Sequence, residues 1–397
     1  MARQFAPRHF LRIAPNASLA AYFQYAGVLE HISFENRAET EIDDIYEAWQ
    51  ALPTAQRTQL DADFTQIDSL ATDEGIATLH EEAQFLHVLL GDSSENSLHD
   101  KVFSAFLQHR DLFDRVWQIV NAVDRPGKYW SRRNDLPEVR ARTDANTLAT
   151  LASALRFYYT QSEGRGQVCV VEPCERESIT YFFCYLADRG RVEMEFDDHD
   201  RLAREPSRRA FEVIFMVSPT RNALEIFQEG SARTTKALET IFARIVFGFD
   251  LPQRRDETVY ELNAFKDRNF QFLYDPNLGI TGVSIKKLRF TALGGIKRRA
   301  TLEADPSFDR AAIHDFMEAL FQTSGSALDG GRLPLAAFNI TLAQLQVKFE
   351  PIPRRRRPTK TFQITFPNGC SLLHEGQDGA IREMLWRSGI ERRPDQN

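Results

Sequence analysis

Four consecutive arginines are the residues of this chain best suited to binding an anion. They are Arg354, Arg355, Arg356 and Arg357. Prolines at 351, 353 and 358 flank the run; they stiffen the loop and keep it out of a strand ladder. Arginine presents planar pairs of donors that match phosphate oxygens. The run therefore predicts salt-sensitive, largely sequence-independent binding to a phosphate backbone.

Two more basic segments extend this prediction. The first is Lys297, Arg298 and Arg299, which with Lys286, Lys287 and Arg289 would form a basic stripe beside the arginine run. The second combines cations with an aromatic ring on which a base can stack, in Lys128, Trp130, Arg132 and Arg133. Alternatives stay open for the arginine run and for both of these segments. Basic loops are often solvated or paired with acidic surfaces, and a Trp in a connection often anchors it to the core.

One acidic cluster has residue types that hold hard metal ions. Its candidate ligands are Glu193, Glu195 and Asp198. Metal-dependent hydrolysis requires carboxylates that converge on one ion, usually from several elements, whereas these three are local in sequence. We therefore expect no metal here and interpret the cluster as the solvated end of a strand.

The cysteines and the remaining motifs give little support to catalysis. Cys169, Cys174, Cys184 and Cys370 lack the paired spacing of a zinc site, so we expect buried, reduced thiols. The sequence contains no glycine-rich phosphate loop, no serine elbow and no His-Glu-x-x-His motif. We expect no cofactor.

Charge is segregated along the chain. The chain carries a net charge of −7, but 17 acidic and two basic residues fall between Glu30 and Asp100, which gives −15 there and +8 elsewhere. An acidic surface repels nucleic acid. Phosphate contact is therefore expected from the second half, and a protein partner is expected at the acidic helices. Acidic and basic halves that pack on each other are the alternative.

The first 161 residues show mostly helical periodicity. Apolar residues recur at steps of three and four in the segments 41–52, 54–67 and 76–86. Thr54 and Ser97 are candidate helix caps, and Ser97 begins either one long helix or a broken pair. Residues 124–144 contain prolines and many basic residues, so we interpret them as an exposed basic connection inside an acidic helical domain of residues 1–161.

From residue 162 to 397 the period changes to that of strands. Three segments, 210–248, 281–322 and 338–390, each show the order strand, turn, strand, helix, which suggests internal repeats. No strand, helix, strand alternation of the parallel type is present. The predicted fold class is α+β, with an N-terminal acidic helical bundle followed by an antiparallel-sheet region of strand-turn-strand-helix units.

These observations favour a non-enzymatic, nucleic-acid-associated binding protein. DNA or RNA would meet the basic half, and a protein partner the acidic helices. Two alternatives remain: an interaction or scaffold module without nucleic acid, and a metal-dependent hydrolase. We find no signal peptide and no apolar run of membrane-spanning length, so a cytoplasmic location and no membrane partner are expected.

Overall fold

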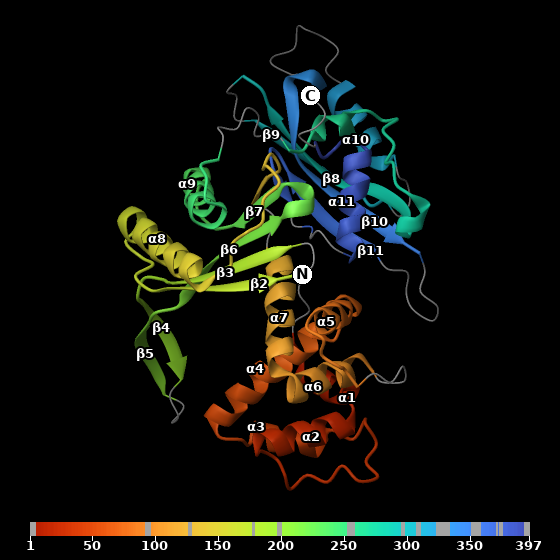
Figure 1. Cartoon of the computed structure of the whole chain (residues 1–397). Helices are drawn as coiled ribbons and strands as arrows, with labels where there is room; N and C mark the ends of the chain where they lie inside the picture. The colour runs from red at the N-terminus through yellow and green to blue at the C-terminus, as the bar shows by residue number, and fades with distance from the viewer. Residues whose placement is uncertain are drawn as a thin grey trace. The chain divides into compact units, whose positions relative to one another are not determined.

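A computed structural model describes most of the chain. The described residues are 5–91, 97–125, 129–176, 179–196, 201–251, 259–294, 298–306, 311–322, 334–350, 359–370, 372 and 376–392. Within them lie eleven α-helices and three antiparallel sheets, which confirms the mixed α+β class (Figure 1). In these ranges no helix is long and apolar enough to cross a membrane.

The chain divides into two compact units. The first unit comprises Met1–Ala122 and Gly190–Arg209, and the second comprises Val123–Arg189 and Ala210–Asn397. The predicted boundary at residue 161 differs from this division, because α8 (Ala145–Glu163) lies almost entirely before that residue and yet belongs to the second unit. Leu151 and Leu155 of α8 are fully buried in the same core as strand residues of that unit, so the helix packs with a sheet.

Helices that share one apolar core make up most of the first unit. They are α1 (Pro7–Ile13), α2 (Asn16–Ala26), α3 (Asp43–Gln50), α4 (Thr54–Leu70), α5 (Asp73–Phe85), α6 (Leu98–Gln108) and α7 (Arg110–Asp124). The Phe64 ring lies at the centre of the core, 4.7 Å from the ring centroids of both Phe10 and Tyr22. The Tyr22 hydroxyl donates to Asp63 at 2.7 Å, which satisfies a polar group inside this apolar region.

Capping explains where two of these helices begin. The Ser97 side chain accepts from the Asp100 N–H, and Asp100 accepts in return from the Ser97 N–H, so Ser97 caps α6 as predicted. The broken pair is the correct alternative, because α6 ends before His109 and α7 begins at Arg110. Thr54 is different: it is the first residue of α4, and Pro53 occupies the cap position without a side-chain bond.

The first unit also contains an isolated hairpin. Strands β4 (Arg191–Phe196) and β5 (Leu202–Ser207) pair only with each other in the described structure.

In the second unit, one five-stranded sheet has the order β1-β7-β6-β3-β2. Its strands are β1 (Trp130–Arg133), β2 (Cys169–Glu175), β3 (Thr180–Ala187), β6 (Ala210–Ser218) and β7 (Ala223–Phe227). The helices α8 and α9 (Ala232–Phe242) bury their apolar sides in one core with Phe182, Phe215 and Ile226 of the sheet. A π-helical turn, η3 (Ala243–Phe247), continues α9, and a short 3-10 turn, η2 (Pro219–Arg221), joins β6 to β7.

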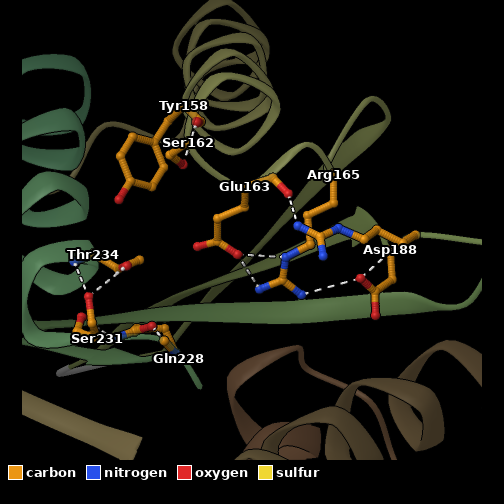
Figure 2. Close-up of polar contacts among 10 residues, drawn as sticks. Tyr158, Ser162, Glu163, Arg165, Asp188, Gln228, Ser231 and Thr234 are labelled. Carbon is orange, nitrogen blue, oxygen red and sulfur yellow. Dashed lines mark hydrogen bonds and ion pairs between the residues drawn. The ribbon is translucent and has the colours of Figure 1, made fainter.

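Polar contacts hold the C-terminal end of α8 near the end of β3. The helix ends at Gly164, whose φ of +65° is a left-handed conformation that glycine adopts readily. Arg165 then donates to Glu163 at 2.8 Å and to Asp188 at 3.4 Å, as Figure 2 shows. Its guanidinium lies 3.7 Å from the centroid of the Phe211 ring. Figure 2 also shows Ser231, whose side chain caps α9 by accepting from the Thr234 N–H.

The second sheet of this unit has the order β12-β11-β10-β8-β9. Its strands are β8 (Ile280–Ala292), β9 (Arg299–Glu303), β10 (Phe338–Phe349), β11 (Thr359–Thr365) and β12 (Gly369–Cys370). The helices α10 (Ala312–Gln322) and α11 (Gly376–Arg387) contribute Ile313, Met317, Ile381 and Leu385 to the core on one face of this sheet (Figure 1). The chain segments between these elements contain three short 3-10 turns: η4 (Leu262–Lys266), η5 (Pro276–Leu278) and η6 (Leu335–Ala337).

The three predicted repeat segments each contain an antiparallel strand pair and then a helix: β6, β7 and α9; β8, β9 and α10; and β10, β11 and α11. Common ancestry of these segments stays a prediction.

Two arginines and two glutamates are buried together where the two sheets of the second unit meet. These residues, which we call the buried ion cluster, are Arg132, Glu225, Arg382 and Glu391, with exposures between 0% and 4%. Arg132 lies 3.4 Å from Glu225 and 3.0 Å from Glu391. Arg382 lies 3.0 Å from Glu225 and 3.7 Å from Glu391. Each guanidinium therefore contacts both carboxylates.

Backbone bonds join the same region. The Arg132 N–H donates to the Asn368 carbonyl at 3.1 Å, next to β12, and Glu261 pairs with Ile390 through a 2.8 Å bond. Burial alone lowers the pKa of an arginine, but Glu391 and Glu225 hold the pKa of Arg132 above its ordinary value. The cluster connects β1, β7, α11 and the chain after α11.

We predict that Arg382→Met reduces the free energy of unfolding by about 3–5 kcal/mol, because it leaves two buried carboxylates with one guanidinium. Urea unfolding monitored by circular dichroism measures this loss. Arg387→Met is the matched control on the same helix, since Arg387 pairs with Glu383 near the surface. It should cost less than about 0.5 kcal/mol. Equal losses in the two variants would contradict the assignment.

Candidate nucleic-acid interface

The second sheet of the second unit has one apolar and one polar face. Leu288 and Phe290 of β8, and Ala343 and Leu345 of β10, are buried in the core that includes α10 and α11. Successive side chains of a strand point to opposite faces. The residues between these apolar ones therefore form the other face of the sheet, which we call the polar sheet face.

The pairing register arranges the polar sheet face in rows. One row crosses four strands through Gln363, Gln344, Lys287 and Glu303, and the next passes through Thr365, Leu342, Arg289 and Thr301. The outer rows add Thr291, Asn339 and Arg299 at one end, and Thr359 and Lys348 at the other. All of these side chains are half-buried or exposed. These rows thus consist of amide, hydroxyl and cationic groups, together with the carboxylate of Glu303 and the apolar side chain of Leu342.

A bulge in β10 places the Thr341 hydroxyl beside two side chains of β8. The register between β10 and β8 shifts at Thr341, which leaves an additional residue on β10. Thr341 accepts from Arg289 Nε at 3.3 Å and lies 2.9 Å from the Thr291 hydroxyl. The bulge therefore orients the Arg289 guanidinium without neutralising it.

Positive charge on the polar sheet face is only partly compensated. Lys287 pairs with Glu303 at 2.9 Å. By contrast, none of the described carboxylates pairs with Arg289, Arg299 or Lys348. Partial burial, together with the charge of Arg299, lowers the pKa of Arg289 below its ordinary value. Two like charges that lie close together without a carboxylate form a site that an anion stabilises.

The other predicted basic residues have different outcomes. Arg298 and Arg299 are exposed at the end of the sheet where β8 finishes. Lys297, Lys128 and the run Arg354, Arg355, Arg356 and Arg357 lie outside the described residues. The chain leaves β10 at Phe349 and enters β11 at Thr359, at the end opposite Arg299. Between these two ends of the sheet, the predicted basic stripe would have to run through Arg289 and Lys287 of β8.

The exposed basic connection predicted for 124–144 needs correction. Trp130, Arg132 and Arg133 form strand β1, and their exposures are 7%, 3% and 4%. Arg133 pairs with Asp135 at 2.6 Å, and Arg132 belongs to the buried ion cluster. A phosphate backbone cannot reach these three side chains. Glu225 and Glu391, the carboxylate partners of Arg132, are far away in sequence, so composition alone gave no sign of them.

The predicted metal candidates are not brought together as a site. Glu193 binds Arg209 in an ion pair of 2.5 Å. The Glu195 side chain and Asp198 lie outside the described part of the structure. Nowhere in that described part do three potential ligands gather around one point.

Sequence reasoning missed the amide and hydroxyl groups of the polar sheet face. Gln344, Gln346 and Gln363 carry no charge, so the pattern of charged residues does not reveal them. A signal was present: in residues 338–349, FNITLAQLQVKF, polar residues alternate with apolar ones, which is typical of a strand with one polar face.

Comparison with known proteins gives no independent guide to this site. No protein family matches the chain, and no curated protein is similar to it.

Cysteine chemistry provides a test of whether the chain has a reactive thiol. Burial raises the pKa of Cys169 to about 11 and also raises those of Cys184 and Cys370. We predict slow alkylation of the native chain at pH 8. The rate at Cys169 should rise about tenfold from pH 8 to pH 9, against about threefold for an ordinary thiol. Mass spectrometry after iodoacetamide treatment measures both rates, and urea-unfolded chain is the control. Rapid alkylation of any native cysteine at neutral pH would contradict the prediction.

Proposed function

We propose that the chain is a non-enzymatic, nucleic-acid-associated binding protein whose polar sheet face contacts the phosphate backbone. The observation that carries the proposal is the group of Arg289, Arg299 and Lys348, which have no carboxylate partner among the described residues. Anions of a repeating polymer would neutralise these charges one after another along the sheet and release counterions.

The neighbouring groups support this choice of ligand. Side-chain amides and hydroxyls, such as those of Gln344, Gln363 and Thr365, donate to phosphate and sugar oxygens without selecting a base. None of the described residues that form the rows of the polar sheet face is aromatic. The proposed contact is therefore with the backbone and largely independent of sequence.

The acidic helices take a different role in this proposal. Some of their carboxylates are neutralised locally, for example Asp43 by Arg8 at 2.6 Å and Asp44 by Arg37. The stretch from Glu30 to Asp100 still carries 17 acidic residues against two basic ones, and such a surface repels a polyanion. A basic protein surface is the partner that suits it.

The proposal predicts the salt dependence of binding. In Arg289→Gln/Arg299→Gln, the slope of log K against log salt for single-stranded DNA or RNA should become shallower by roughly 1.4 to 1.8. Fluorescence anisotropy over a range of salt concentrations gives this slope. Arg244→Gln/Arg268→Gln removes two surface arginines that already pair with carboxylates, and it should leave the slope nearly unchanged. Equal effects of the two double variants, or no binding by the wild-type chain, would refute the proposal.

One observation favours the alternative of a protein-interaction module. On the hairpin β4-β5, Val192, Met194 and Phe196 share one face and are 69%, 69% and 68% exposed. Leu202, opposite Phe196, is 49% exposed, whereas Glu193 and Ala203 on the other face are half-buried. The apolar face is thus the more exposed one, which costs free energy unless another surface covers it.

A second copy of this chain is the occupant that suits this hairpin. When the apolar faces of two copies stack with their β4 strands pointing the same way, Phe196 of one copy lies over Leu202 of the other, and Met194 lies over Arg204. The face is therefore complementary to itself. The area is small, and self-association should therefore be weak.

Met194→Ser/Phe196→Ser should abolish concentration-dependent self-association and leave the melting temperature unchanged, because both side chains are exposed. Sedimentation velocity and thermal unfolding provide the two readouts. Phe316→Ser/Leu320→Ser, on the exposed side of α10, is the matched control and should self-associate like the wild type. A wild-type chain that stays monomeric at high concentration would rule out this alternative.

A further inference from the structure

An open hollow in the second unit is lined almost entirely by aromatic side chains and one arginine. Its lining residues are Phe272, Leu273, Tyr274, Trp386 and Arg387, and its volume is about 530 Å³. Two chain segments form it: residues 272–274 and the last turn of α11. None of the lining side chains is a carboxylate.

Hydrogen bonds and ring packing hold the two segments in place. The Leu273 N–H donates to the Ser388 hydroxyl at 2.8 Å, directly after α11. The Phe272 ring packs edge to face against Phe270, with centroids 5.1 Å apart, and lies 5.8 Å from the buried Phe265 ring. One end of the hollow is therefore anchored to the core, while Phe272, Tyr274 and Trp386 remain half-exposed.

The arginine is positioned by a neighbouring carboxylate. Arg387 Nε lies 3.0 Å from Glu383, one helical turn earlier. This bond occupies one edge of the guanidinium, and no described group accepts from its two terminal nitrogens. Those nitrogens are available to an anion at the rim of the hollow.

We infer that this hollow binds an unstacked nucleobase and that Arg387 contacts the phosphate of the same nucleotide. Aromatic rings stack on bases of any sequence, and an open hollow suits a base that belongs to a continuing strand. Aromatic cages for cationic ligands depend on cation–π attraction, which the positive charge of Arg387 opposes here. The inference rests on the proposed function, and it adds that the preferred ligand is single-stranded.

The test compares two single-stranded oligonucleotides of equal length and charge, one with bases and one fully abasic. The wild-type chain should bind the oligonucleotide with bases about tenfold more tightly, which is the range of one stacked base. Trp386→Leu and, as a second variant, Tyr274→Leu should remove this preference and leave the affinity for the abasic strand unchanged. Phe316→Leu, an exposed aromatic on α10, is the matched control and should retain the preference.

The outcomes separate this inference from the proposed function. Equal, salt-dependent binding of both oligonucleotides by the wild type would overturn the base site and leave backbone binding in place. Equal weakening of both strands by Trp386→Leu and Tyr274→Leu would also overturn it. If neither oligonucleotide binds at any salt concentration, both the inference and the proposed function fail.

Discussion

The buried ion cluster is the constraint on which the second unit depends. Removing a guanidinium or a carboxylate from water costs several kcal/mol, and a buried pair offsets this only when its geometry is good. Here each guanidinium contacts two carboxylates, so no charge depends on a single partner. Arg382 also donates to the Leu372 carbonyl and to the Tyr260 hydroxyl. Displacement of any of these segments would leave a buried charge without compensation.

The same principle distinguishes structural arginines from candidate binding arginines. Arg132 and Arg382 carry the same guanidinium group as Arg289 and Arg299, but carboxylates face them inside the protein. On the polar sheet face the strands bring Arg289 and Arg299 close together and provide Glu303 only to Lys287. An arginine that is partly desolvated beside another cation is stabilised by an external anion. The proposed function depends on this contrast and not on the number of basic residues.

Local patterns in the sequence were enough to predict many elements and few of the contacts. The step of three and four in residues 41–52 corresponds to α3, and the strand, turn, strand order expected in 210–248 corresponds to β6, η2 and β7. The environment of residues 130–133 could not be predicted in this way. Arg132 is buried against Glu225 and Glu391, which are distant in sequence and lie beside it only in the tertiary structure. Helix α8 is a similar case, because its periodicity gives the helix but not the core that it joins.

Base stacking and backbone binding rest on different physical interactions, so one chain that used both would show two different responses to salt. The proposed backbone contacts on the polar sheet face would be electrostatic, so salt would weaken them. The inferred stacking in the hollow would remove apolar ring surface from water and would be much less sensitive to salt. Ser388 fixes the hollow through the end of α11, and Arg382 on the same helix belongs to the buried ion cluster. Helix α11 therefore connects the geometry of the hollow to the joint between the two sheets, so a change that loosens this joint should affect stacking before it affects backbone binding.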